Sequence, residues 1–288
     1  MIEYASLIID IEKSRGYGVK DRTGIQKILM DYTEILNRMF CESEEFRVTF
    51  SAGDSLQGLF VDVVSAYMYF RLLEILMHPV KLRAGIGVGE WTIKIENGMS
   101  TQQDGPAYHN ARWAIEDVYN SQLSNIRIYS GEYDNLANHL MNASLQLKRQ
   151  QMPMQNYVQV LNELIFPFTV YDSVYQGFLD GISDIITIKA EIVKMRQRPT
   201  YAGFNSTKQK FEVGSIEKNL MALVNPINIE KKGVECEYMI SRSTQPAVIA
   251  DILQSSRQNA ATVMKRGNVL KIRELDCVAL QYLKERYA

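Results

Sequence analysis

Short apolar runs alternate with amphipathic stretches over the first 150 residues, a pattern typical of an α/β domain. Residues 5–9 form a nearly continuous apolar run, as expected for a strand that is covered on both faces. After a loop with Gly16 and Gly18, apolar residues recur at steps of three and four from Ile25 to Met39. This spacing predicts an amphipathic helix after the first strand.

A hairpin is expected next. Two strand-like segments, 46–50 and 56–61, flank Gly53 and Asp54, a pair of residues suited to a tight turn. The elements predicted after it are a helix over 63–77, a strand over 81–87, a helix over 107–118 and a strand over 126–129. The order βα, hairpin, α, β, α, β predicts an α/β (α+β) domain that is built on one sheet.

The remainder of the chain differs in pattern. Residues from about 131 to 200 have helical periodicity, and Ser243–Tyr287 is helical again. Residues 199–241 contain several Pro and Gly and are either a loop-rich linker or a small β insert. We therefore predict three segments, namely a domain over 1–149, a helical middle region over 150–241 and a C-terminal segment over 242–288.

Composition narrows the class of protein. The chain has 288 residues, 46% of them hydrophobic and 23% charged, which is typical of a globular protein. A formal charge of −1 provides no global field for nucleic acid or an anionic membrane. Three widely separated cysteines and three histidines lack metal-ligand spacing. With neither a signal peptide nor an apolar run of about 20 residues, a cytoplasmic protein without a membrane partner is expected.

Two carboxylates are candidates for metal binding. Asp10 stands where the first strand is expected to end, and Asp54 stands at the tip of the hairpin. Mg²⁺ or Mn²⁺ takes hard oxygen ligands, often one or two carboxylates together with substrate phosphates. Two such ions could activate a hydroxyl and neutralise a leaving pyrophosphate. The alternative is that Asp10 caps a strand and Asp54 is only a favoured turn residue.

The residues around these acids resemble known families. Residues 9–14 (IDIEKS), 53–56 (GDSL) and 82–90 (LRAGIGVGE) resemble the strand and hairpin motifs of class III nucleotide cyclases. The stretches LIIDIEKSR, AGDSLQGLF, KLRAGIGVGE and DGPAYHNARWAIE together more closely resemble the SatD family. The resemblance covers roughly residues 4–116 and part of the C-terminal segment. It implies a ferredoxin-like cyclase/palm domain.

Specific roles follow from the cyclase resemblance. It implies that Asp10, Asp54 and the carbonyl of Ile11 hold Mg²⁺ or Mn²⁺. Arg112 matches the arginine that contacts the substrate, whereas Tyr108 stands where that motif has asparagine. Tyrosine cannot supply the paired donor and acceptor of an amide, so the helix motif does not support classical ATP or GTP cyclisation. Because cyclase sites form between two protomers, the resemblance also implies a homodimer.

Other residues near the expected site are candidates for phosphate contacts. Gly53 and Ser55 flank Asp54, and Lys20 and Arg22 follow Asp10 in what the pattern predicts to be a loop. The alternative for the two basic residues is a solvated loop.

The helix that carries Arg112 offers another candidate anion site. Its start, at residues 104–107, would present free amide groups to an anion. Arg112 is four residues from Glu116, so a surface ion pair is the alternative to a phosphate contact. Gly85, Gly87 and Gly89 alternate within a strand, which favours close packing of a helix or a partner sheet over a phosphate loop.

The C-terminal segment fits a helix-turn-helix. A helix over 245–253, a turn over 254–256 and a helix over 257–266 are predicted, with Gln254 where a glycine is usual. The segment 242–288 holds eight Lys or Arg and four Asp or Glu, which gives a local charge of +4. The residues that its second helix would expose to double-stranded DNA are Arg257, Gln258, Asn259, Thr262, Lys265 and Arg266. Lys265–Asn268 (KRGN) matches a K-R-x-N ending that the SatD resemblance implies, and a hairpin for self-association is the alternative.

Three hypotheses follow. The first is a metal-dependent nucleotide-binding protein with a cyclase-like activity, either phosphorus–oxygen lyase or nucleotidyltransferase, acting on a nucleoside triphosphate. The second is a transcriptional regulator that binds double-stranded DNA in response to a nucleoside triphosphate or cyclic nucleotide and whose cyclase-like domain does not convert it. The third is a structural partner in which neither site works.

Overall fold

The computed structural model describes residues 3–53, 55–95, 98–170, 174, 176–196, 220–231, 233–242 and 245–287. The chain forms two compact units. The first, called the sheet unit, comprises Met1–Gln146 and Leu275–Ala288, and the second, called the helical unit, comprises Leu147–Glu274. The division into three functional segments stays a prediction.

A five-stranded sheet forms the centre of the sheet unit. Its strands are β1 (Tyr4–Ile11), β2 (Glu44–Ala52), β3 (Ser55–Phe60), β4 (Leu82–Gly89) and β5 (Ile126–Tyr129). The strand order is β2-β3-β1-β4-β5, and all pairs are antiparallel except β4 and β5, which are parallel. With α1 (Val19–Met39) and α2 (Val63–Met77), the first four strands have the β-α-β-β-α-β order of a ferredoxin-like fold. The predicted α/β fold and its central hairpin are confirmed.

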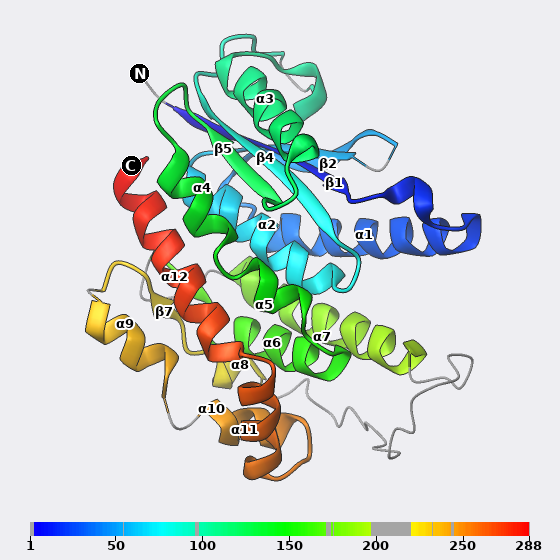
Figure 1. Cartoon of the computed structure of the whole chain (residues 1–288), viewed down its shortest axis with the longest axis vertical. Coiled ribbons are helices and arrows are strands. Elements are labelled where there is room, and N and C mark those ends of the chain that lie inside the picture. Colours follow the sequence, from blue (N-terminus) through cyan, green and yellow to red (C-terminus); the bar gives the residue numbers. More distant parts are fainter. Residues whose placement is uncertain are drawn as a thin grey trace. The chain divides into compact units, whose positions relative to one another are not determined.

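The helices cover both faces of this sheet. Helices α1 and α2 lie on one face, and α3 (Pro106–Asn120) lies on the other (Figure 1). Residues of β1 alternate accordingly, and Ile8 packs with Ala111 and Ile115 of α3. A Cβ atom on Gly87 would lie 2.0 Å from the amide nitrogen of Ala111, so only glycine lets α3 approach β4 this closely. The predicted packing role of the alternating glycines is confirmed at Gly87.

The outer edge of β5 is covered by side chains instead of another strand. Asn138 of α4 (Asn135–Asn142) accepts from the Ile128 amide at 2.7 Å and donates to the Ile128 carbonyl at 3.2 Å. Asn142, one turn later, donates to the Ile126 carbonyl at 2.8 Å. The two amides thus satisfy strand groups that an edge otherwise leaves to water or to another chain.

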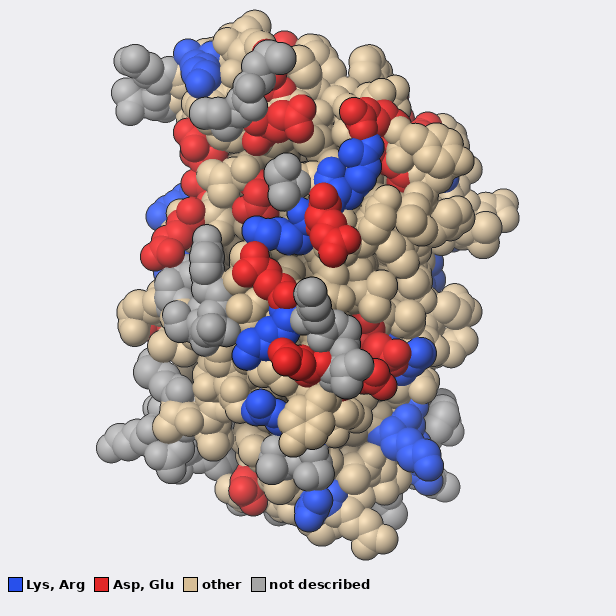
Figure 2. Space-filling model, turned by 90° about the vertical axis from the view of Figure 1, so that its left-hand side faces the viewer, with Lys and Arg blue, Asp and Glu red and all other residues tan. Residues whose placement is uncertain are grey.

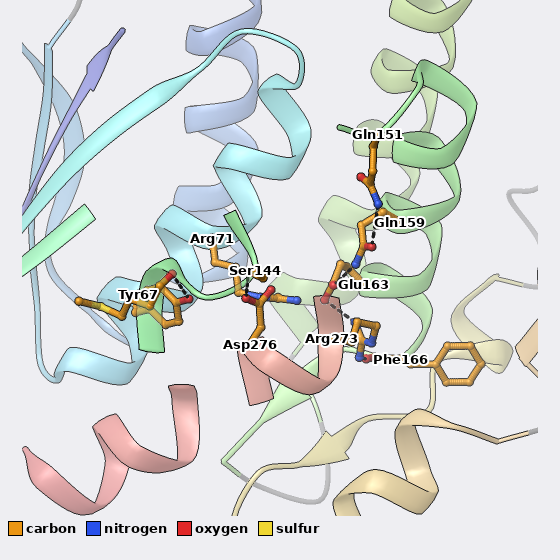
Figure 3. Close-up of polar contacts among 10 residues, drawn as sticks. Tyr67, Arg71, Ser144, Gln151, Gln159, Glu163, Phe166, Arg273 and Asp276 are labelled. Atoms are coloured by element: carbon orange, nitrogen blue, oxygen red, sulfur yellow. Dashed lines mark hydrogen bonds and ion pairs between the residues drawn. The ribbon is translucent and has the colours of Figure 1, made fainter. Parts of the chain in front are cut away.

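A buried ion pair fixes the end of the chain in the sheet unit. Asp276 lies on the part of α12 (Val269–Arg286) that belongs to this unit. Its carboxylate accepts from Arg71 of α2 at 2.5 Å and from the Ser144 hydroxyl (Figure 3). The side chains of Asp276 and Arg71 are 1% and 5% exposed. A charge pair so far from water contributes to stability only while both partners and their hydrogen bonds are present.

The helical unit contains most of the remaining elements. Its α-helices include α6 (Pro153–Ile165), α7 (Gln176–Arg196), α8 (Leu220–Leu223), α9 (Gly233–Ile240), α10 (Gln245–Ile252) and α11 (Arg257–Arg266). The short helix α5 (Leu145–Arg149) joins the two units in sequence. Strands β6 (Phe168–Thr169) and β7 (Ile227–Asn228) pair in parallel. The described residues between 150 and 241 are therefore mostly helical, as the pattern predicts. Of the segment 199–241, which the sequence predicts to be a linker or a small β insert, residues 199–219 lie outside the described part of the chain, and β7 pairs with β6, which precedes that segment.

Polar side chains lie at the centre of the helical unit. Gln159 donates to Glu163, which in turn pairs with Arg273 (Figure 3). Asn162 donates to Gln245 at 3.2 Å and so links α6 to α10. Because these side chains are buried, each needs its hydrogen-bond partners to avoid a desolvation cost.

One predicted boundary is wrong. Helix α1 begins at Val19, with Gly18 extended at its N-cap, instead of near Ile25. Lys20 and Arg22 therefore lie in the first turn of a helix and not in a loop. Val19 is the one apolar residue of 19–24 and is exposed, so this turn has no apolar periodicity and the pattern does not reveal it. Among the helices of the described residues, none is long and apolar enough to cross a membrane.

Candidate functional site

The end of β1 brings Asp10 beside an arginine. Asp10 is directly opposite Arg83 of β4 in the antiparallel register, and the two side chains lie on the same face of the sheet. Arg83 Nη2 is 3.1 Å from Asp10 Oδ2, and the side chains are 15% exposed for Asp10 and 24% for Arg83. Strand β1 continues to Ile11, so Asp10 is the penultimate residue of the strand. The site is thus open to solvent but already contains a cation.

The hairpin turn lies beside the same strand end. Ile9 pairs with Leu56, and continuing this register by one residue places Ser55 opposite Asp10 on the β3 side. Gly53 has a φ of 64°, the left-handed conformation that glycine adopts easily, and forms the predicted turn. Asp54 lies outside the described residues. The structure therefore brings Asp10, Ser55 and the Gly53 turn to one end of the sheet.

The carbonyl of Ile11 also faces this hairpin. The amide of Glu12 donates to the Lys81 carbonyl at 2.8 Å, so Glu12 points its backbone groups toward β4. In an antiparallel ladder neighbouring residues alternate in direction, which points the Ile11 carbonyl toward β3 and the turn. A carboxylate and a carbonyl oxygen fit a hard divalent cation, although two oxygens alone do not complete its coordination. Among the described residues, no group of three or more His, Cys, Asp or Glu could hold a metal ion.

One side of α3 faces the strands that carry these groups. Tyr108 packs against Leu59 of β3, and the ring of Tyr119 lies under the guanidinium of Arg83 at 4.3 Å. Arg112 lies between them along the helix at spacings of four and seven residues, and it is exposed. Helix α3 thus carries Arg112 on the side of the sheet where Asp10 lies. We call Asp10, Ser55, Arg83, Arg112 and Tyr119 the strand-end cluster.

Tyr108 differs from Arg112 in its surroundings. It is 1% exposed, and its hydroxyl is 3.5 Å from the Ser100 hydroxyl of η2 (Ser100–Gln102). Burial raises the pKa of Tyr108 to about 12, so the phenol is neutral at physiological pH. Tyr108 and Arg112 are four residues apart on α3, but the first side chain is buried and the second is exposed. The ion pair of Arg112 with Glu116, which is the alternative to a phosphate contact, does not form in the described part of the chain.

The expected anion site at the start of α3 is wrong. The amide of Ala107 donates to the Glu90 carbonyl at 3.2 Å, and the amide of Tyr108 donates to the Gly105 carbonyl at 3.0 Å. Pro106 has no amide hydrogen, and Asp104 places a carboxylate 3.5 Å from His109 Nε2. The first turn of α3 is thus occupied by protein acceptors and next to a negative group, neither of which favours an anion.

The other predicted phosphate contacts lie in α1. Arg22 is half-buried there, and its amide donates to the Gly18 carbonyl at 2.9 Å. Lys20 lies in the same turn, and its side chain is outside the described part of the structure. Arg22 forms no hydrogen bond or ion pair with the described residues of the strand-end cluster.

The second candidate site is the pair α10 and α11. Gln254 between them has a φ of 46°, so it adopts the left-handed conformation for which glycine is usual. The Ser256 hydroxyl accepts from the Asn259 amide at 3.1 Å and caps α11. Five predicted DNA contacts are exposed, and the sixth, Asn259, is half-buried. The five exposed residues are Arg257, Gln258, Thr262, Lys265 and Arg266.

Charges outside α11 add less than the sequence count suggests. Of the basic residues in the C-terminal segment, Arg273 is buried against Glu163, Lys271 pairs with Glu274 at 3.0 Å, and Arg286 pairs with Glu132. Acidic and basic side chains are interspersed over the face of the molecule drawn in Figure 2. A basic surface would therefore be local to α11.

Sequence reasoning missed two residues of the strand-end cluster. The sequence marks Arg83 only as part of the 82–90 motif, and no motif marks Tyr119. The register of β1 with β4 identifies Arg83 as the partner of Asp10, and the helical spacing from Arg112 to Tyr119 was visible in the sequence. The stacking of Arg83 on Tyr119 depends on the distance between α3 and the sheet. The alternating glycines indicate that this distance is short but do not give its value.

Comparisons with known proteins identify the family. The model of the SatD family matches residues 4–196. The chain belongs to the SatD family. A solved structure described as a bacterial light-regulated adenylyl cyclase is similar to part of this SatD family chain, with 15% identity and a TM-score of 0.32. The similarity covers 44% of this chain and 75% of that one. The comparison with curated proteins gave no match.

Proposed function

We propose that this SatD family protein binds a nucleoside triphosphate together with Mg²⁺ or Mn²⁺ at the strand-end cluster. The observation that carries the proposal is the position of Asp10. Its carboxylate stands at the end of a central strand, partly exposed, beside the Ile11 carbonyl and the Gly53 turn. Carboxylate and carbonyl oxygens at such a position suit a hard cation that also binds phosphates.

The residues of the cluster and its neighbours would have different roles in binding the cation and the nucleotide. Asp10, the Ile11 carbonyl and Asp54 would hold the cation, whose chemistry is to neutralise phosphate charge. Arg112, exposed on α3, would orient a phosphate with its planar guanidinium. Gly53 would let the hairpin backbone approach the nucleotide, and Ser55 would donate a hydroxyl. Tyr108 would support α3 from inside the core, which is where its burial places its side chain.

If the site is an enzyme, the expected reaction is attack of a 3′-hydroxyl on the α-phosphate. A new P–O bond then forms, and the bond to pyrophosphate breaks. The test is incubation with each labelled nucleoside triphosphate and Mg²⁺ or Mn²⁺, followed by separation of the products. A product that is lost in both Asp10→Ala and Asp54→Ala supports the activity. Conversion that persists in both variants contradicts it.

A DNA-binding regulator is the second candidate function. It is favoured by α11, which exposes Arg257, Gln258, Thr262, Lys265 and Arg266 while Ala260 and Met264 are buried. In that case a nucleotide would bind without being converted, and a homodimer would set the spacing of two half-sites.

Salt-dependent DNA affinity tests the regulator hypothesis. Arg257→Ala and Lys265→Ala should each weaken binding and lower the slope of affinity against salt concentration. Glu237→Ala, at an exposed position of α9, is a control that should leave DNA affinity unchanged or slightly increased. Affinity that does not change in either basic variant would rule out α11 as the contact surface.

A further inference from the structure

The pair formed by Asp10 and Arg83 lies at the proposed metal site. Arg83 Nη2 lies 3.1 Å from the same carboxylate that would hold the cation. The two residues are direct neighbours in the β1–β4 register, so this arrangement follows from the sheet itself. A guanidinium and a divalent cation repel each other at such distances. The guanidinium of Arg83 and a divalent cation therefore compete for the Asp10 carboxylate, and each lowers the affinity of the other.

Arg83 has a second contact, with the ring of Tyr119. The guanidinium carbon lies 4.3 Å from the centre of the Tyr119 ring, a favourable cation–π geometry. This contact does not depend on Asp10, because Tyr119 is on α3 and Asp10 is on β1. Arg83 can therefore leave the carboxylate and still be held by the ring.

Arg83 also has a hydrogen-bond donor that is not used within the described part of the chain. Its Nε is buried and has no hydrogen-bond partner among the described residues. A buried donor that lacks a partner costs free energy until an acceptor arrives. Oxygens of a phosphate are acceptors that match the donors of a guanidinium in pairs.

We propose that Arg83 is an internal counter-ion of Asp10 that a divalent cation displaces, and that the displaced guanidinium, held by Tyr119, then binds a phosphate of the nucleotide. This inference rests on the proposed function and adds a binding order to it. The metal binds first, because it releases the Arg83 guanidinium from Asp10 and makes it available to a phosphate of the nucleotide. It assigns to Arg83 opposite effects on the two ligands. Arg83 weakens the binding of the metal alone and strengthens the binding of the nucleotide.

Binding of Mn²⁺ alone tests the first half. Free Mn²⁺ is measured by electron paramagnetic resonance in titrations of the full chain, in wild type and in Arg83→Gln, Arg83→Lys and Asp10→Asn. Arg83→Gln removes the competing charge and should bind Mn²⁺ about fivefold to tenfold more tightly. Arg83→Lys keeps the charge and should remain close to wild type. Asp10→Asn should lose this binding.

The matched control is Arg127→Gln. Arg127 lies on the neighbouring strand β5 and is 3.8 Å from Asp117, with side chains 35% and 63% exposed. The substitution removes the same charge from the same sheet but away from Asp10. Its Mn²⁺ affinity should equal that of wild type, and thermal unfolding of every variant verifies that it is folded.

Nucleotide binding tests the second half. The α,β-methylene analogues of ATP and GTP are titrated at saturating Mn²⁺ and followed by calorimetry. Arg83→Gln should bind the analogue at least about tenfold more weakly, as expected for the loss of a charge-assisted hydrogen bond. Tyr119→Leu should weaken analogue binding in the same direction. Arg127→Gln should have no effect.

The possible failures differ from one another. If wild type binds Mn²⁺ through Asp10 and Arg83→Gln has the same affinity, the counter-ion role of Arg83 is wrong while the proposed function stands. If Arg83→Gln binds Mn²⁺ more tightly but the nucleotide equally well, the transfer to phosphate is wrong. If no variant binds Mn²⁺ or nucleotide, the proposed function itself fails and the role of Arg83 fails with it.

Discussion

Asp10 and Asp276 each pair with an arginine within the sheet unit, but their surroundings are opposite. The Asp10–Arg83 pair lies at a strand end, 3.1 Å apart, with side chains 15% and 24% exposed. The Asp276–Arg71 pair is 1% and 5% exposed, and Asp276 also accepts from Ser144. Water can replace a partner at the first pair and cannot do so at the second.

The difference separates an exchangeable ion pair from a structural one. An exposed or partly exposed pair contributes little to stability because each charge remains solvated when the other leaves. A buried pair is costly to break because the remaining charge has no solvent. Only the pair at the strand end is therefore suited to release its carboxylate to another ligand.

The largest expected effect comes from breaking the buried pair. Asp276→Ala leaves Arg71 buried without this carboxylate and should lower the free energy of unfolding by about 3–5 kcal/mol. Urea denaturation measures the change. Glu132→Ala, which removes the exposed partner of Arg286, is the matched control and should cost less than about 1 kcal/mol. Equal losses in the two variants would contradict the distinction between buried and exposed pairs.

The next effect concerns α3, the helix whose Tyr119 contacts Arg83. Gly87→Ala places a Cβ atom 2.0 Å from the Ala111 amide and 2.1 Å from the Ala107 carbonyl, so α3 must move away from β4. Overpacking of this kind should cost about 3 kcal/mol and shift the tryptophan fluorescence of Trp113 on α3. Gly24→Ala, at an exposed position of α1 where nothing lies within 4 Å, should stabilise the protein by about 0.5–1 kcal/mol. A stable Gly87→Ala variant with unchanged fluorescence would show that α3 is not tightly seated.

A third carboxylate shows what burial does without a close arginine partner. Burial raises the pKa of Glu44 from 4.5 to about 8, and the charge of Arg47 offsets only part of this effect. The folded state keeps a proton that the unfolded state releases, so the free energy of unfolding should fall as pH rises from about 4.5 to about 8. Glu44→Gln should remove this slope and be more stable than wild type by about 1–2 kcal/mol at pH 8.5.

Urea denaturation at several pH values between 4.5 and 8.5 measures the slope. Glu45→Gln is the control because Glu45 is the exposed neighbour on the same strand. Parallel pH profiles of wild type and Glu44→Gln would mean that Glu44 is ionised in the folded protein at neutral pH.

The smallest effect concerns a carboxylate that is paired with backbone instead of arginine. Asp62 caps α2 by accepting from the Ser65 amide at 2.8 Å and from the Ser65 hydroxyl at 2.7 Å. Asp62→Ala should lower the free energy of unfolding by about 1 kcal/mol, and Asp62→Asn should retain most of it. A thermal melt of the three proteins distinguishes the cap from a general loss of charge.

Local signals were sufficient to predict much of the sheet unit. The Gly53 turn, the apolar periodicity of α2 and the short apolar run of β5 each depend on neighbours in sequence, and α2 and β5 have the predicted bounds. The first turn of α1 cannot be predicted from periodicity because Val19 is its one apolar residue. Asp10 could be placed at the strand end, but its pairing with Arg83 requires the strand register.

Long-range polar contacts could not be predicted in this way. Arg71 and Asp276 are 205 residues apart, and neither is marked by a motif or by its neighbours. Tyr108 stands where the cyclase helix motif has asparagine, and its burial depends on contacts with Leu59 and Ser100 that only the folded chain supplies. Burial of a polar residue is a property of the tertiary structure, so sequence pattern alone underestimates it.

The asparagines on α4 have a consequence for how this protein can assemble. Asn138 and Asn142 present amides to β5 as a neighbouring strand would, so the sheet ends there without offering a template to another chain. Strand β2 is the opposite edge, and its register with β3 is irregular. Growth of the sheet from copy to copy would need two compatible edges. At the β5 edge, two asparagines one helical turn apart occupy the backbone groups that such growth would need.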